Sequence, residues 1–436
     1  MAQDPFDILD ERAYSIPKAD APELAALGPF GVGVTELTFT DPNRPDIVEA
    51  VAGRTPSASR DVPVTLWYPA IKGTSHSPIV YTGKLNFRPG ARPEGVPETY
   101  RHSGIANVAA DPATGERFPL IIISHGYGNW AAFLSYLGEN LASKGYVVAS
   151  IEHTDLPYTD FASFNISFGN TMLNRSRDQR FVIEKLIEIA GSDNPVGQII
   201  DANNIGLIGY SMGGFGAIAS AGAGYDQTGP SLNQIPAPML SGLLGDNNFI
   251  APHPALKAIV AIAPWGAAPV NRSWKAEALE NIKLPLLFIA GDHDDVSGYD
   301  DGIKWLYDGA VNADRHMLVY ENGRHSIGGN PEPPFADDYF DLTDWFNEPV
   351  WRRDRVVGIN QHFVTAFMNL HLKANEDARS YLDVAPLRSS DGEWPIPPGG
   401  YTGNQVSDGD QDGKPYWKGF QRRWALGLQM HRAKAR

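Results

Sequence analysis

The residues best able to do chemistry lie near the middle of the chain, in the run Gly209-Tyr210-Ser211-Met212-Gly213-Gly214. This run directly follows the apolar segment NIGLI and precedes a helix-like stretch of small residues. A serine between glycines at a strand-to-helix turn adopts strained backbone angles, and the glycines let the neighbouring chain approach closely. A tight glycine turn with an incidental serine is the alternative. The strand before and the helix after favour Ser211 as a nucleophile at the carboxyl edge of a sheet.

A serine hydroxyl needs a general base, and the base needs a carboxylate that orients it. The apolar run PLLFIA is followed by GDHDDV, and the run MLVYE is followed by NGRHS. We interpret His325 as the base because it follows the last strand in a loop flanked by glycines, although a hydrogen-bonding loop histidine would fit there too. For the acid, the first loop offers Asp292, Asp294 and Asp295, and spacing leaves the choice among them open.

Acyl transfer builds negative charge on a carbonyl oxygen, which two preorganised N–H groups can stabilise. The backbone N–H of Met212 is one expected donor, because it lies at the N-terminus of the helix after the nucleophile. The second is expected in the loop His125-Gly126-Tyr127-Gly128, which follows the run FPLIIIS. We assign it to the Tyr127 N–H. An ordinary glycine-rich turn is the alternative.

Six continuous apolar runs predict the strands that position these residues, because such runs are typical of strands buried on both faces of a parallel sheet. Helical patterns over 130–143 and 172–189 separate them, which predicts an α/β fold with a doubly wound, mostly parallel sheet. The runs are FPLIIIS (118–124), YVVASI (146–151), NIGLIGY (204–210), KAIVAIA (257–263), PLLFIAG (285–291) and MLVYE (317–321).

The flanking segments show weaker patterns. Val34–Phe39 and Val62–Tyr68 predict short strands, with a long turn over 41–60 between them. Val356–Leu372 predicts a closing helix, and the chain is expected to end in a basic helix.

Three connections, near 154–171, 222–256 and 328–352, exceed the usual length and are candidate lids. The third contains the aromatic insert Pro334–Trp351, whose six aromatic residues directly follow the His325 loop. Because so much apolar surface is unfavourable in water, we expect the insert to cover the site, with Trp345 and Phe346 contacting substrate.

Composition excludes several classes of protein. The chain has 436 residues and a net charge of −15, from 36 Lys+Arg against 51 Asp+Glu, and we predict no nucleic-acid partner because such partners need clustered positive charge. The absence of cysteine excludes disulfides, thiolate nucleophiles and thiolate metal sites.

No stretch of the sequence approaches the ~18 consecutive apolar residues that a membrane-spanning helix needs. An exported location, periplasmic or extracellular, is favoured over a cytoplasmic one.

One acidic stretch resembles half of a calcium loop. Asp408, Asp410 and Asp412 alternate and are followed by Gly413, but the twelfth position holds Gly419 where a bidentate Glu is expected. We therefore favour a solvated acidic turn and expect no metal and no cofactor.

Taken together, the segments LWYPA, PLIIISHGYGNW, LASKGYVVASIEHTD, GYSMGG and GRHS resemble two families of the α/β-hydrolase superfamily. These are the dienelactone-hydrolase-like proteins and the plasma-type platelet-activating-factor acetylhydrolases. The resemblance covers roughly residues 30–375 and implies a cofactor-free Ser-Asp-His carboxylic ester hydrolase.

The chain departs from both families. Dienelactone hydrolases carry Cys at the nucleophile, where this chain has Ser211. In the acetylhydrolases the acid follows the strand after the nucleophile helix, where this chain has Ala263-Pro264-Trp265. The resemblance therefore implies an acid on the next strand, at Asp294.

GYSMGG, Tyr127, APW and GDHDDV also look like segments of bacterial cutinase-like polyester hydrolases. That resemblance implies Asp294 as the acid, Tyr127 as an oxyanion donor and Trp265 as an aromatic that stacks on the substrate acyl group. A core aromatic under the sheet edge is the alternative for Trp265.

We therefore expect one α/β-hydrolase domain over 31–375, an N-terminal segment over 1–30 and a C-terminal extension over 376–436 packed on the domain. The expected substrate is an uncharged, fairly apolar ester, either a small molecule or a polymer. Hydrolysis of a polyester, a lipid ester or a thioester is an alternative, and a peptidase could use the same residues. A non-catalytic binding module is the alternative from a different class of protein.

Overall fold

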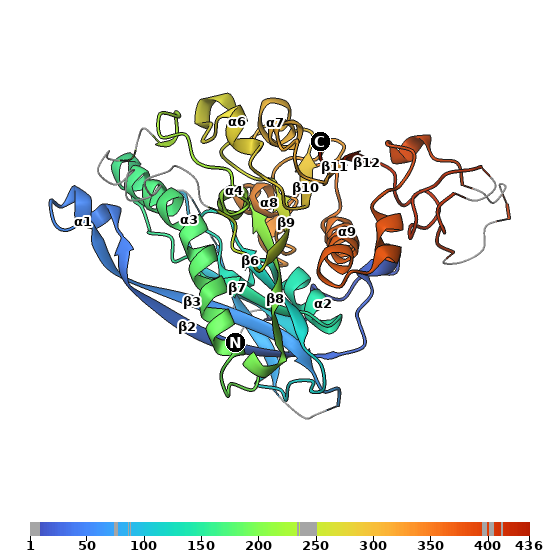
Figure 1. Cartoon of the computed structure of the whole chain (residues 1–436), viewed down its shortest axis with the longest axis horizontal. Helices are drawn as coiled ribbons and strands as arrows, with labels where there is room; N and C mark the ends of the chain where they lie inside the picture. The colour runs from blue at the N-terminus through green and yellow to red at the C-terminus, as the bar shows by residue number, and fades with distance from the viewer. Residues whose placement is uncertain are drawn as a thin grey trace.

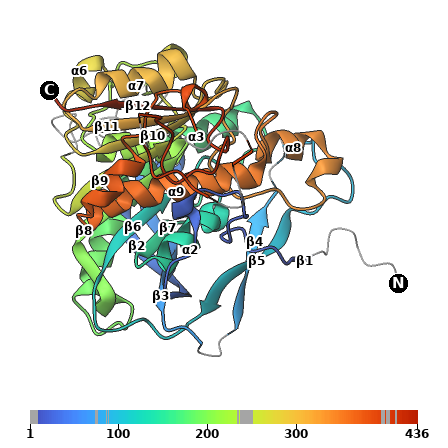
Figure 2. The ribbon, with the colours of Figure 1, turned by 90° about the vertical axis from the view of Figure 1, so that its right-hand side faces the viewer.

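The computed structural model describes residues 9–73, 77–85, 87, 89–232, 235, 251–394, 399–400, 405–410 and 413–436. Its centre is a 12-stranded sheet with the order β1-β5-β2-β3-β7-β6-β8-β9-β10-β11-β12, and β4 pairs with β5 at one end (Figures 1 and 2). The strands are β1 (Leu9–Asp10), β2 (Gly31–Pro45), β3 (Ser57–Ala70), β4 (Pro78–Lys84), β5 (Thr99–Val108), β6 (Phe118–Ser124), β7 (Val147–Ile151), β8 (Ile200–Tyr210), β9 (Leu256–Ile262), β10 (Leu286–Gly291), β11 (Arg315–Tyr320) and β12 (Leu428–Ala433).

The central strands from β7 to β11 run parallel. Every residue of β6, β7, β10 and β11 is buried, as the continuous apolar runs predicted. Antiparallel strands flank them, with β3 beside β7 and β12 beside β11. The predicted doubly wound, mostly parallel sheet is confirmed.

Helices cover both faces of this sheet (Figures 1 and 2). The long helix α3 packs with the short helix α4 on one face, and α2 packs with α9 on the other. The helices are α1 (Ile47–Val51), α2 (Ser135–Ser143), α3 (Phe161–Ala190), α4 (Met212–Ser220), α6 (Ala276–Leu279), α7 (Lys304–Gly309), α8 (Phe340–Phe346) and α9 (Arg353–Leu372). A π-helical turn spans Tyr299–Ile303, and 3₁₀ turns span Glu23–Ala25, Ala131–Leu134, Gly197–Ile199, Pro269–Asn271, Ala336–Asp338, Glu376–Tyr381 and Ser389–Asp391.

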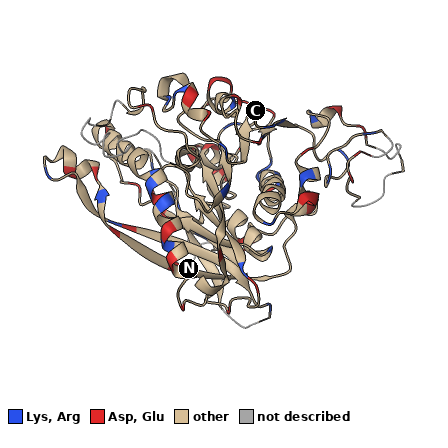
Figure 3. Cartoon of the chain, in the orientation of Figure 1, with Lys and Arg blue, Asp and Glu red and all other residues tan. Residues whose placement is uncertain are grey.

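Helix α3 extends beyond the periodic segment that predicted it, and begins inside the expected lid near 154–171. Asp160 caps it: the Asp160 carboxylate accepts the Ser163 N–H at 2.8 Å, and the Ser163 hydroxyl accepts the Asp160 N–H at 3.0 Å. Residues 161–174 of α3 include no charged side chain, and charged residues of both signs lie on the rest of the helix (Figure 3). This part of the insert is therefore a capped helix rather than a loop.

Two predictions at the ends of the sheet were wrong. The segment 41–60 is not a long turn, because β2 continues to Pro45, α1 follows and β3 begins at Ser57. The chain does not end in a basic helix. Residues 428–433 form β12 instead, and all six pair with β11, whose backbone groups would otherwise form an open sheet edge.

The other two inserts differ in how far the structure describes them. Within 222–256, residues 233, 234 and 236–250 lie outside the described part of the chain. Within 328–352, the 3₁₀ turn and α8 give regular structure. Each helix in the described part of the chain is too short or too polar to span a lipid bilayer.

Candidate active site

Ser211 lies at the sharp turn between β8 and α4, with φ 52° and ψ −113°. The flanking positions must be glycine because neighbouring backbone atoms lie too close to leave room for a side chain. A Cβ on Gly209 would clash with the Gly213 carbonyl, and a Cβ on Gly213 would clash with the Ser124 carbonyl of β6. The turn therefore holds the Ser211 hydroxyl at the carboxyl edge of the sheet, where the G-x-S-x-G spacing predicted it.

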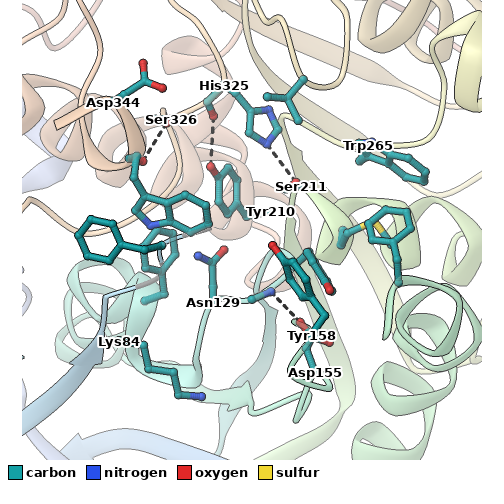
Figure 4. A pocket seen from close by; sticks show the side chains of 18 of the residues that line it. Lys84, Asn129, Asp155, Tyr158, Tyr210, Ser211, Trp265, His325, Ser326 and Asp344 are labelled. Carbon is teal, nitrogen blue, oxygen red and sulfur yellow. Dashed lines mark hydrogen bonds between the residues drawn. The ribbon is translucent and has the colours of Figure 1, made fainter. Parts of the chain in front are cut away.

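The structure brings Ser211, His325 and Asp294 together from three different strand ends. The Nε2 atom of His325 lies 3.0 Å from Ser211 Oγ (Figure 4). Its Nδ1 atom lies 2.8 Å from Asp294 Oδ2. Because a carboxylate only accepts, Nδ1 carries the proton and Nε2 is left to accept the serine proton. This arrangement can transfer a proton from serine to histidine.

Asp294 is buried, and its second oxygen accepts the N–H groups of Val296 at 2.9 Å and Ser297 at 2.7 Å. Burial by itself raises the pKa of this carboxyl group, but the His325 imidazole and the two amides outweigh it and hold the pKa below the usual value. Asp294 is therefore the ionised partner of the imidazole.

The two competing acids face elsewhere. The Asp292 carboxylate accepts the Asn322 N–H at 2.6 Å, and Asp295 pairs with Arg324 at 2.8 Å. Of the three acids left open by spacing, only Asp294 contacts the imidazole.

The loop that carries His325 is held by residues that the sequence analysis did not find. Buried Glu348 accepts the Arg324 N–H, and the Arg353 side chain donates to carbonyl groups just after the histidine. Tyr210 packs its ring beside the imidazole, with centroids 5.5 Å apart, and its hydroxyl donates to the His325 carbonyl at 3.3 Å. No local pattern links these residues to His325.

The two expected oxyanion donors both border the cavity above Ser211. Met212 is the first residue of α4, and the first N–H groups of a helix have no intrahelical acceptor. Tyr127 lies in the loop after β6, and a Cβ on the preceding Gly126 would lie 3.2 Å from Ser211 Cβ. Both backbones are thus next to the nucleophile, and their role stays a prediction.

The cavity has a volume of about 680 Å³ and contains Ser211 and His325 in its wall. Trp265 lies on one side of Ser211, and Lys84 and Asp344 lie on the other (Figure 4). On the Trp265 side, ring contacts join Tyr127, Tyr158, Phe164, Phe168 and Trp265. Of these, Tyr127, Tyr158, Phe168 and Trp265 line the cavity, which therefore has an aromatic wall on that side. Trp265 lies in this wall rather than in the core.

The structure separates the two residues predicted from the aromatic insert. Trp345 lines the cavity. Phe346 does not: its side chain is 1% exposed and packs near Tyr100 and Phe133. Neighbouring side chains on a helix point about 100° apart, so one faces the cavity and the next faces the core. Assigning Phe346 to the substrate wall was wrong.

The acidic turn gives no support for a metal site. Asp408 and Asp410 are described, whereas Asp412 lies outside the described residues. Within the part of the chain that the structure covers, no group of three or more His, Cys, Asp or Glu side chains could hold an ion.

A second Ser-His-Asp set lies beneath the first. His153 joins Ser124 Oγ at 2.7 Å and Asp178 Oδ2 at 2.9 Å, and all three side chains are fully buried. Burial lowers the pKa of His153 to about 4. Because these side chains are shut off from solvent, a substrate cannot reach them and the set is structural.

Comparisons with known proteins agree with this geometry. A family model described as platelet-activating factor acetylhydrolase, isoform II, matches residues 25–165. The platelet-activating factor acetylhydrolase of Cavia porcellus is 31% identical over 134 residues, which are 29% of this chain and 28% of the relative. Cutinase est1 of Thermobifida alba is 24% identical over 216 residues, 49% of this chain and 55% of the relative. The matches thus span about half, or less, of each relative.

A solved structure, a ferulic acid esterase from Streptomyces cinnamoneus, aligns with a TM-score of 0.51 and 21% identity. The alignment covers 81% of this chain and 94% of that one. The chain has the α/β-hydrolase fold, and the resemblance to acetylhydrolases and cutinases expected from its motifs is confirmed.

Proposed function

We propose that this protein is a serine carboxylic ester hydrolase that works through an acyl-enzyme. The observation that carries the proposal is the unbroken hydrogen-bonded series Asp294, His325, Ser211, which opens into a cavity. The relatives are acetylhydrolases and cutinases, which are ester hydrolases, and this supports the same chemistry here.

In the proposed mechanism, Ser211 Oγ attacks the ester carbonyl carbon while His325 Nε2 takes the serine proton. The N–H groups of Tyr127 and Met212 stabilise the negative carbonyl oxygen. When the tetrahedral intermediate collapses, the C–O bond to the alcohol breaks and His325 returns the proton to the leaving oxygen. Water then attacks the acyl-enzyme by the same route, which releases the acid and restores Ser211.

The cavity supports an uncharged and fairly apolar ester. Its aromatic wall, with Trp265, suits an apolar group, and Trp345 adds a second aromatic surface. Both cations in the wall already have acidic partners, since Arg324 pairs with Asp295 and Asp344 and Lys84 pairs with Glu152. An anionic substrate would therefore find no unpaired cation among the described lining residues.

A panel of p-nitrophenyl esters of increasing chain length, with a matched amide and thioester, tests this function. We expect ester turnover that disappears in Ser211→Ala. Turnover restricted to the thioester or the amide would move the reaction to another class. Tight binding without turnover would indicate the non-catalytic binding module instead.

Two expectations from the sequence remain part of the proposal. The division into 1–30, 31–375 and 376–436 is tested by limited proteolysis, which should cut first near these boundaries. An exported location is tested by fractionation of the native cells.

A further inference from the structure

An ion pair lies directly behind the loop that carries Tyr127. Arg175 of α3 is 1% exposed and binds Asp155 through two bonds, Nη1 to Oδ1 at 2.8 Å and Nη2 to Oδ2 at 2.7 Å. Arg175 Nη2 also donates to the Gly126 carbonyl at 3.0 Å. Asp155 Oδ2 in turn accepts the Gly128 N–H at 2.8 Å. The pair therefore holds the backbone on both sides of Tyr127.

A second donor reaches the same Gly126 carbonyl. His125 Nδ1 lies 2.7 Å from this oxygen, and His125 Nε2 accepts the His153 N–H at 3.2 Å. These two bonds require the proton on Nδ1. Burial lowers the pKa of His125 to about 3, so the ring stays neutral at ordinary pH. The Gly126 carbonyl is thus fixed by a guanidinium group and an imidazole, in addition to the Asn129 N–H of the same turn at 3.3 Å.

The fixed carbonyl matters because it shares a peptide unit with the Tyr127 N–H. A trans peptide is planar, and its C=O and N–H bonds point in opposite directions. Bonds that hold the Gly126 oxygen toward α3 therefore direct the Tyr127 hydrogen away from α3. They also polarise the peptide, which makes its N–H a stronger donor.

We infer that Arg175 and Asp155 are positioning residues for the oxyanion hole, acting through the Gly126–Tyr127 peptide. The inference rests on the proposed esterase function. The ion pair has no net charge as a unit, so it contributes orientation and peptide polarisation rather than a bulk positive field. The oxyanion forms only in the transition state. Loss of the Arg175–Asp155 ion pair should therefore lower kcat more than it raises KM.

A purely structural role is the competing explanation, since breaking a buried ion pair destabilises most folds. Arg315 provides a control for the loss of a buried guanidinium group elsewhere in the fold. It is a buried arginine at the start of β11, where it donates to the Tyr307 carbonyl at 2.7 Å and to the Ala313 carbonyl at 3.2 Å. It contacts no residue of the proposed site.

The experiment compares Arg175→Met with Arg315→Met for melting temperature, kcat, KM and affinity for a trifluoromethyl ketone, which forms a charged adduct with the serine. We expect Arg175→Met to lose about 10- to 100-fold in kcat with KM within about threefold, since removing one oxyanion donor costs 10²–10³ and here the donor is only misaligned. Inhibitor affinity should fall by the same factor as kcat/KM. Arg315→Met should keep kcat within about twofold.

Asp155→Asn, which keeps the side-chain shape, decides the matter if Arg175→Met does not fold, and should give the same pattern at a smaller factor. The inference is overturned if the folded variant keeps kcat within about threefold, or if kcat falls while inhibitor affinity is unchanged. A wild-type protein without Ser211-dependent turnover would overturn the proposed function and this inference together. Normal wild-type turnover matched by Arg175→Met would overturn the inference alone.

Discussion

Ser211 is one of the described non-glycine residues with positive φ, a conformation that costs of order 1–3 kcal/mol. Such a cost persists only where the surroundings enforce it, and here the clashes that exclude side chains at Gly209 and Gly213 do so. The strained turn is therefore the residue-level reason why the serine hydroxyl stands free of the helix and meets His325.

Replacing Ser211 by Ala should abolish ester turnover and leave the fold intact, with a loss on the order of 10⁴–10⁶ in kcat. Steady-state kinetics on purified protein, with circular dichroism to check the fold, measures this. Retention of more than a tenth of wild-type activity would exclude Ser211 as the nucleophile.

Asp294→Asn should lower kcat by roughly 10⁴, because it removes the carboxylate that orients the imidazole. Asp292→Asn and Asp295→Asn are matched controls, since their carboxylates contact Asn322 and Arg324 instead. Kinetics of the three variants side by side decides the assignment. A larger loss at Asp292 or Asp295 would show that another acid serves His325.

Spacing alone could predict the serine and the histidine but not the acid. The strand-to-helix context determines where Ser211 points, whereas three acids in one loop differ only in how the turn rotates each side chain. The N–H groups of Val296 and Ser297 hold Asp294 toward the histidine, and such a turn leaves no signature in spacing. Arg175 was missed for the same reason, because its partners Asp155 and Gly126 come from separate loops.

Among the secondary-structure elements, the central strands could be predicted directly from their apolar runs, whereas the elements at the edges of the sheet could not. A buried parallel strand can be predicted from its own sequence because both of its faces are apolar, which gives a continuous apolar run. The conformation of a short edge strand such as β12 depends on the strand it pairs with. The local sequence of residues 428–433 is therefore also compatible with the helix that we predicted. The insert with α8 shows the same limit, because its aromatic residues divide between cavity and core.

This division of α8 predicts different effects for its neighbouring aromatics. Trp345→Ala should change the ratio of kcat/KM between long and short esters, with acetate-ester turnover within roughly tenfold of wild type, since one pocket contact is worth about 1–3 kcal/mol. The p-nitrophenyl ester series measures it. An unchanged chain-length preference would make the insert a structural brace.

Phe346→Ala is the matched control within the same helix. Its ring is fully buried against Tyr100 and Phe133, so the substitution should lower the free energy of unfolding by about 3–5 kcal/mol. Urea denaturation measures this loss. A shift in chain-length preference at full stability would instead place Phe346 at the substrate.

At the scale of the whole molecule, several histidines are buried and neutral. Burial lowers the pKa of His125 to about 3, of His153 to about 4 and of His362 to about 3. The unfolded chain binds these protons near pH 6.5, so the stability that the histidines contribute is complete above that pH and is lost as pH falls toward the folded values.

The free energy of unfolding should therefore fall by about 2 kcal/mol per buried histidine between pH 7.5 and pH 5. Urea denaturation at the two pH values measures the slope. His362→Gln should reduce the slope, because the pKa of the buried His362 imidazole lies well below its usual value. Equal stability at the two pH values would contradict neutral burial.

The acidic turn near Asp408 should not contribute to stability through an ion, because the bidentate carboxylate of a calcium loop is missing at Gly419. Adding EDTA should leave the melting temperature unchanged, since only a bound ion stabilises by RT ln(1 + [L]/Kd). A fall on chelation that calcium reverses would show a calcium site.

Mass spectrometry of the covalent intermediate tests the assignment of Ser211 as the nucleophile most directly. The protein is mixed with a slowly deacylating p-nitrophenyl ester, quenched in acid and digested. We predict a mass increase equal to the acyl group on the peptide that contains Ser211, and no such increase in Ser211→Ala. An acyl group on another residue, or ester turnover without any acylated peptide, would contradict the proposed acyl-enzyme at Ser211.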